Sequence, residues 1–119
     1  MLDSARRSRR RQRRPARAAV VIRYRYHPEA IAEYRAAVTW YRQRSQDAAR
    51  RLRDAVNAGL RSIRERPLAW PVWRGGPARR RVLQDVPYSL VFAVETDEIV
   101  IFAVAHHSRD PDYWIDRMR

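Results

Sequence analysis

The pattern of apolar and polar positions predicts a strand at the start of the folded chain. Through residues 20–26, apolar and aromatic side chains alternate with the others, at Val20, Ile22, Tyr24 and Tyr26. A period of two is typical of a strand with one buried face. The dipeptide His27-Pro28 ends this strand, and Pro28 suits the first turn of a following helix.

Two amphipathic helices are predicted next. In the first, apolar residues recur at spacings of three and four, with Trp40 beside them: Ile31, Tyr34, Val38 and Tyr41. The second helix, for which Asp47 is the expected N-cap, ends at Pro67 and repeats this spacing at Ala49, Leu52, Val56, Leu60 and Ile63. The very short link between them predicts an antiparallel helical pair.

The second half of the chain predicts three strands, over residues 78–84, 88–94 and 99–105. Their short connections are typical of an antiparallel meander, and the last two are apolar enough to be central strands. Trp70 and Trp73 precede them in a stretch rich in Pro and Gly, where we expect them to cover the core. Residues 110–115 predict a short capped helix that returns Trp114 to the sheet.

These elements define an α+β fold with the order β-α-α-β-β-β. We expect a helical hairpin packed on a small, mainly antiparallel sheet, followed by a short C-terminal helix. With 119 residues, of which 45% are hydrophobic, the chain has room for one domain with a core.

Charge divides the chain into two parts. All 26 basic residues are Arg, and they stand against 13 acidic residues, for a net charge of +13. Residues 1–17 hold eight of these arginines and only one acid, Asp3. We therefore expect residues 1–18 to be a disordered Arg-rich tail and residues 19–119 to be the folded domain. Three interpretations of the tail stay open: it binds a polyanion, it is a solvated appendage, or translation starts near Val20 and never makes it.

Composition also narrows the chemistry. The chain has no Lys and no Cys, so lysine bases, Schiff bases, thiolate nucleophiles and disulfides are excluded. We find no Gly-rich phosphate loop, no G-x-S-x-G and no H-E-x-x-H, and we expect no cofactor and no metal. The helical pair Glu29 and Glu33 is expected to be solvated charge. The pattern of a signal peptide and a long apolar run are both missing, which predicts a cytoplasmic protein without a membrane span.

A few groups could carry chemistry on a phosphodiester. His106 could serve as a base, and Tyr113 and Arg109 could assist it. His106 and His107 are adjacent on a strand, so they are expected on opposite faces. If the meander order holds, the start of the strand with Arg79, Arg80 and Arg81 lies at the opposite end of the sheet from His106, so sequence alone does not assemble one cluster. Those three arginines either touch a partner or protect an edge strand.

Residues 20–117 resemble the RelE/ParE superfamily of toxins from bacterial type II toxin-antitoxin modules, often called plasmid stabilisation proteins. The resemblance rests on short segments in a fixed order, and the most specific is the ending from Ala103 to Trp114, A-V-A-H-H-S-R-D-P-D-Y-W, followed by Arg117. The others are Tyr26 to Ala30, Ala36 to Tyr41, Ile63 to Pro67, and Arg81 to Leu83 leading to Pro87-Tyr88.

The resemblance implies a growth-inhibiting toxin that a cognate antitoxin neutralises, with operator DNA contacted indirectly through that antitoxin. Its ParE-like members act on DNA gyrase and need no active site, and this is the interpretation we favour. Its RelE-like members cut mRNA on the ribosome, so whether the chain is an enzyme stays open. The catalytic candidates His106, Tyr113 and Arg109 apply only to this alternative. Arg79, Arg80, Arg81 and Arg117 are the candidates for binding RNA or a partner.

Overall fold

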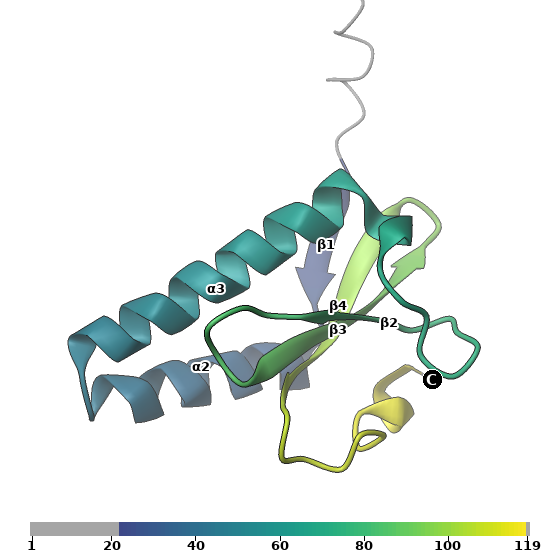
Figure 1. The fold of residues 1–119 in the computed structure, drawn as a ribbon. Coiled ribbons are helices and arrows are strands. Elements are labelled where there is room, and N and C mark those ends of the chain that lie inside the picture. The colour runs from purple at the N-terminus through teal and green to yellow at the C-terminus, as the bar shows by residue number, and fades with distance from the viewer. Residues whose placement is uncertain (1–21, 119) are drawn as a thin grey trace, which may run out of the picture.

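The computed structural model describes residues 22–118, and the predicted Arg-rich tail lies outside the described residues. The order of elements is β1 (Arg23–Tyr26), α2 (Pro28–Arg42), α3 (Gln46–Glu65), a 3-10 turn η1 (Pro67–Ala69), β2 (Arg79–Val82), β3 (Tyr88–Glu95), β4 (Glu98–His106) and a second 3-10 turn η2 (Ile115–Met118). This confirms the α+β class and the order β-α-α-β-β-β (Figure 1).

The four strands form one sheet in the order β1-β4-β3-β2. β2, β3 and β4 are antiparallel neighbours, as the meander predicts, whereas β1 lies parallel to β4 with Arg23 opposite Glu98. The apolar strands β3 and β4 occupy the two central positions. Their positions therefore agree with the prediction from composition.

The helices α2 and α3 cover one face of this sheet. Every apolar residue predicted for the buried stripe of α3 is buried, from Ala49 to Ile63. The N-cap of α3 is Ser45, whose Oγ accepts a hydrogen bond from the backbone N–H of Ala48 at 3.1 Å. The prediction of Asp47 as the cap was wrong, since Asp47 lies in the first turn and pairs with Arg50.

α2 begins at Pro28 as predicted, and the Nδ1 of His27 accepts from the backbone N–H of Glu29. Its fully buried residues are Ala30 and Ala37, because the helix lies so close to the sheet that only small side chains fit beneath it. The larger predicted residues flank this contact, and Trp40 is 50% exposed.

The chain that follows β4 covers the other face of the sheet (Figure 1). Trp114 is buried there against Val91 and Ala103, and Trp73 packs onto the same cluster. The return of Trp114 to the sheet is confirmed, but residues 111–114 form turns and the helical segment is the 3-10 turn η2. The sheet therefore has a core on each face.

A β-bulge in β4 marks the boundary between its two halves. Val91 pairs with Ala103 and the next residue, Phe92, pairs with Ile101, which leaves Phe102 as an extra residue. Phe102 and Ala103 both face the C-terminal segment as a result.

Candidate functional site

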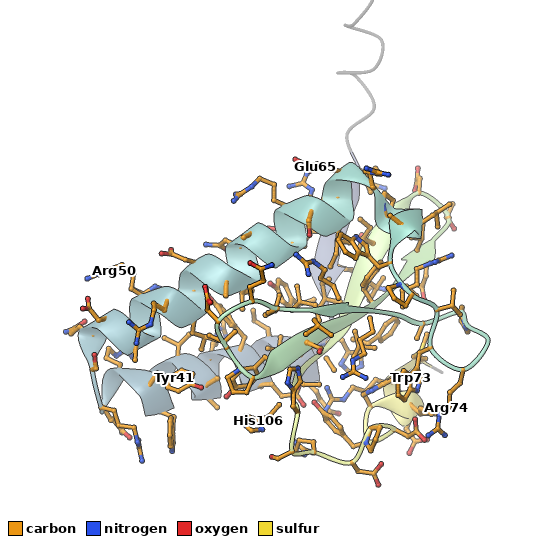
Figure 2. All side chains as sticks on the ribbon, in the orientation of Figure 1. Tyr41, Arg50, Glu65, Trp73, Arg74 and His106 are labelled. Atoms are coloured by element: carbon orange, nitrogen blue, oxygen red, sulfur yellow. The ribbon has the colours of Figure 1, made fainter. Side chains whose placement is uncertain are left out.

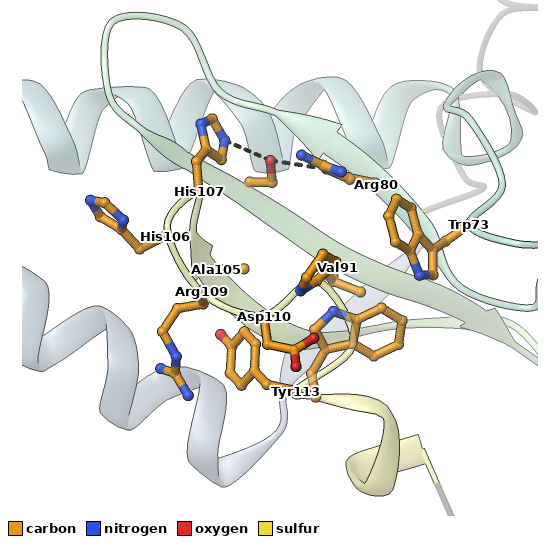
Figure 3. Close-up of a pocket in the computed structure, with 12 residues that line it drawn as sticks. Trp73, Arg80, Val91, Ala105, His106, His107, Arg109, Asp110 and Tyr113 are labelled. Carbon is orange, nitrogen blue, oxygen red and sulfur yellow. Dashed lines mark hydrogen bonds between the residues drawn. The ribbon is translucent and has the colours of Figure 1, made fainter.

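A small pocket lies on the face of the sheet that the helices leave free (Figure 3). Its volume is about 70 Å³. The base is apolar and belongs to the second core, with Val91, Ala105 and Trp114. Polar side chains from β2, β3 and the end of β4 stand around it, namely Arg80, Ser89 and His107. A packed base under polar groups is the usual construction of a ligand site.

Arg80, Ser89 and His107 are joined by hydrogen bonds. Ser89 is 1% exposed, and its Oγ lies 3.0 Å from His107 Nε2 and accepts from Arg80 Nε at 3.3 Å (Figure 3). The guanidinium of Arg80 also lies over the ring of Trp73. Burial and the charge of Arg80 lower the pKa of His107. The neutral form of this imidazole is therefore favoured beside the Arg80 cation.

His106 lies on the opposite face from His107, as the alternation of β4 predicts. Its ring packs edge-on against Tyr88, 5.0 Å between centroids. Its Nδ1 accepts the backbone N–H of Ser108 at 3.0 Å and also lies 2.8 Å from the Ser108 hydroxyl. The lone pair of His106 Nδ1 is therefore already used as a hydrogen-bond acceptor. Figure 2 shows His106 at the end of the sheet near Tyr41 of α2.

Tyr113 and Arg109, the other catalytic candidates, stand at the edge of the pocket. The guanidinium of Arg109 lies 3.8 Å from the centre of the Tyr113 ring. The Tyr113 hydroxyl is buried and lies beside the Glu33 carboxylate. Burial raises the pKa of Tyr113 above its usual value, and the nearby Glu33 carboxylate adds to this. A phenol in this environment exchanges its proton poorly near neutral pH.

Arg117 is an internal residue of the fold. Its side chain is 10% exposed, and it pairs with Glu33 at 2.8 Å. Glu33 also accepts the backbone N–H of Val104, while Arg117 donates to the carbonyl of Phe102. These backbone groups lie on β4 beyond the end of β1, which last pairs at Tyr26. The two side chains therefore satisfy the open edge of β4 where no strand continues.

The expectation of solvated carboxylates holds for Glu29, whose side chain is 67% exposed. It was wrong for Glu33, whose side chain is 17% exposed. Spacing along the helix could not separate the two, because the burial of Glu33 depends on where β1 ends.

Arg79 and Arg81 lie on β2, an edge strand, and both side chains find partners within the fold. Arg79 donates to the backbone carbonyls of Leu68 and Trp70. Arg81 donates to the Ser62 hydroxyl of α3, and its guanidinium lies over the Trp70 ring. These two arginines connect the edge of the sheet to the loop before it and to α3.

The structure brings Arg80 together with the C-terminal candidates, so the expectation that they lie far apart was wrong for this residue. In register, Arg80 is opposite Val91, two residues along β3 from Ser89. The long Arg80 side chain spans that offset and reaches Ser89. Arg80, Arg109 and Tyr113 thus line one pocket.

Sequence reasoning missed Ser89, and it did not give His107 a role. Ser89 is a polar residue within an apolar strand, a signal that could have marked it. Sequence reasoning also did not predict a contact between Trp73 and Asp112. The Trp73 indole donates to Asp112 at 3.0 Å and Arg74 pairs with the same carboxylate at 2.8 Å, which fixes the loop before β2 to the C-terminal segment (Figure 2).

Residues 22–118 contain no group of three potential metal-ligating side chains. None of the helices in this range has the length and apolar character needed to span a bilayer. What the geometry offers is a small pocket lined by Arg80 and Arg109.

A helical pair on one face of a four-stranded sheet, with a C-terminal segment on the other, defines a small α+β fold. Residues 24–111 match the family model described as the ParE toxin of the type II toxin-antitoxin system parDE. The chain belongs to this ParE toxin family, within the RelE/ParE superfamily. The match ends at Pro111, before Tyr113 and Arg117.

A solved structure has the same fold. A chain from the chromosomal ParDE toxin-antitoxin system of P. aeruginosa superposes with a TM-score of 0.61 at 18% sequence identity. The alignment covers 73% of the present chain and 97% of that chain. A search of curated proteins found no match.

Proposed function

We propose that this toxin inhibits growth by acting on DNA gyrase in the cytoplasm and that a cognate antitoxin, encoded in the same module, neutralises it. The observation that carries the proposal is the ParE match over residues 24–111, which includes both helices and all four strands except Arg23 at the start of β1. The related ParDE system in P. aeruginosa supports a partner of the antitoxin class. Operator DNA is then contacted through the antitoxin, and the module acts as a plasmid stabilisation system.

The geometry of the catalytic candidates favours this mechanism over mRNA cleavage. A ribonuclease needs a base with a free lone pair and an acid that can exchange its proton. His106 Nδ1 is occupied by Ser108, and the Tyr113 hydroxyl is buried with a raised pKa. His106 is among the residues that line the pocket, but its ring packs on Tyr88 whereas the ring of His107 contacts Ser89.

The test uses purified toxin with DNA gyrase and supercoiled plasmid. We expect cleaved plasmid to accumulate, and we expect the antitoxin to prevent this. In cells, induction of the toxin should give a DNA-damage response before translation declines. Loss of translation with intact DNA would contradict the proposal and favour the ribosome-dependent endoribonuclease.

Two variants separate these mechanisms within the chain. Tyr113→Phe removes only the phenol oxygen beside Glu33 and keeps the ring that packs on the second core, so the fold should be kept. His106→Ala removes the candidate base. For a gyrase inhibitor, both variants should arrest growth as the unmodified protein does. Loss of toxicity in both, with antitoxin binding intact, would refute the gyrase mechanism.

A further inference from the structure

The strongest unassigned feature of the molecule is an unpaired charge in the pocket. Among residues 22–118, the Arg80 side chain forms no ion pair, and its only hydrogen bond is the one from Nε to Ser89. The remaining guanidinium N–H groups have no protein acceptor in this range. Yet the side chain is half-buried and held in place by Ser89 and the Trp73 ring. A fixed, half-buried cation without a counter-charge favours binding of an anion.

The surroundings of Arg80 strengthen this preference. Arg109 stands at the mouth of the same pocket, and the imidazole of His107 shares the Ser89 hydroxyl with Arg80. Asp110 is the one carboxylate among the lining residues, and its Oδ1 already accepts from the backbone N–H of Asp112. The local charge is therefore positive.

The rings near the pocket are not free to stack with a nucleobase. Guanidinium groups of Arg74 and Arg80 lie 5.3 Å from the centre of the Trp73 ring. The Tyr113 ring has Arg109 at 3.8 Å and Arg117 at 5.0 Å. Because guanidiniums already occupy the surroundings of both rings, the pocket is suited to recognise a charge and not a base.

We propose that Arg80, Ser89 and His107 form a binding site for a phosphate monoester. A volume of about 70 Å³ holds several waters, which is enough for one phosphate group. A monoester has a charge of about −1.5 to −2 and three acceptor oxygens, which suit the free guanidinium N–H groups of Arg80 and the positive charge of Arg109. A carboxylate has one charge and two oxygens and would satisfy Arg80 alone. The proposal does not depend on the cellular target.

Binding is measured by NMR on the full chain, with inorganic phosphate, phenyl phosphate, dimethyl phosphate and acetate as probes. We expect phenyl phosphate to shift the Trp73 indole and His107 ring signals in a saturable way. Dimethyl phosphate and acetate should bind at least tenfold more weakly. Tighter binding of acetate would overturn the proposal and assign the pocket to an acidic protein segment. Shifts that leave Trp73 and His107 unchanged would overturn it as well.

Matched variants test the role of the charge. Arg80→Gln should weaken phenyl phosphate binding at least tenfold, since a charged fork is replaced by a neutral amide. Arg51→Gln removes the same charge from an exposed position on α3, which packs on the other face of the sheet, and should change affinity less than twofold. Equal losses in the two variants would show a general charge effect and refute the site. The wild-type shifts remain decisive if Arg80→Gln fails to fold.

Two oligonucleotides identify the source of the phosphate. A short DNA strand with a 5′-phosphate and the same strand with a 5′-hydroxyl differ only in the monoester. Tighter binding of the phosphorylated strand than of phenyl phosphate, lost in Arg80→Gln, assigns the site to a nucleic-acid end. Equal affinities for phenyl phosphate and the phosphorylated strand assign it to free small-molecule monoesters. Equal affinities for the two strands would contradict recognition of a monoester.

Discussion

The ion pair between Glu33 and Arg117 should be a main stabilising contact of the fold. The change that tests it is Glu33→Gln, which keeps the volume of the side chain and an oxygen for the Val104 N–H. What it removes is the negative charge that faces Arg117 at 2.8 Å. The variant therefore leaves a guanidinium that is 10% exposed without its main counter-charge.

The magnitude follows from this burial. Removing one partner of a buried pair costs about 3–5 kcal/mol. Here Glu29 remains 3.4 Å from Arg117 and is exposed to solvent, so it compensates in part. We expect Glu33→Gln to lower the free energy of unfolding by about 2–3 kcal/mol. In a domain of this size the melting temperature should fall by about 10–20 °C.

The assay is urea unfolding followed by circular dichroism, with an exposed pair as control. Asp47 and Arg50 also lie 2.7 Å apart, but their side chains are 70% and 60% exposed. Asp47→Asn should therefore cost less than about 0.5 kcal/mol. The double variant Glu33→Gln/Arg117→Met should lose less free energy of unfolding than the sum of the losses in the two single variants. A cost for Glu33→Gln no larger than that of Asp47→Asn would refute the role of the pair.

Two further predictions concern a cap and a tyrosine. Ser45→Ala should lower the free energy of unfolding by about 1 kcal/mol, because it removes the hydrogen bond with Ala48. The control Asp47→Ala should lower it by less. If urea unfolding shows the reverse order, the assignment of Ser45 as the cap is wrong. Burial and neighbouring Tyr41 raise the pKa of Tyr88 to about 12, so its contribution to stability is complete below about pH 10 and is lost as pH rises to about 12. The urea midpoint should therefore fall less between pH 8 and pH 11.5 in Tyr88→Phe than in Tyr24→Phe, the control at a more exposed position. Equal falls in the two variants would contradict this prediction.

Sequence periodicity was sufficient to predict the framework. The apolar pattern was enough to predict the buried stripe from Ala49 to Ile63. It was also enough to predict that the two most apolar strands are central, and both predictions were correct. The cap of α3 was missed by two residues, because Ser45 and Asp47 are both residues that favour caps and only the start of the helix distinguishes them.

The site was harder to predict because it depends on pairing between strands. The link from Arg80 through Ser89 to His107 crosses β2, β3 and the end of β4. Its assembly depends on the sheet register and on the length of the Arg80 side chain, and neither is visible as a local pattern. The burial of Glu33 has the same origin, since it follows from β1 ending at Tyr26 while β4 continues.

The parallel pairing of β1 with β4 determines when the protein can fold during synthesis. Arg23 pairs with Glu98, so β1 cannot pair with β4 until β4 has been synthesised. At about 5–20 residues per second, that delay is on the order of 4–15 s. The helices α2 and α3 are synthesised before β2, β3 and β4, so they precede most of the sheet that they cover. A chain whose translation stops before β4 has no partner for β1 and leaves β3 paired with β2 alone, so the complete sheet can form only when synthesis is almost finished.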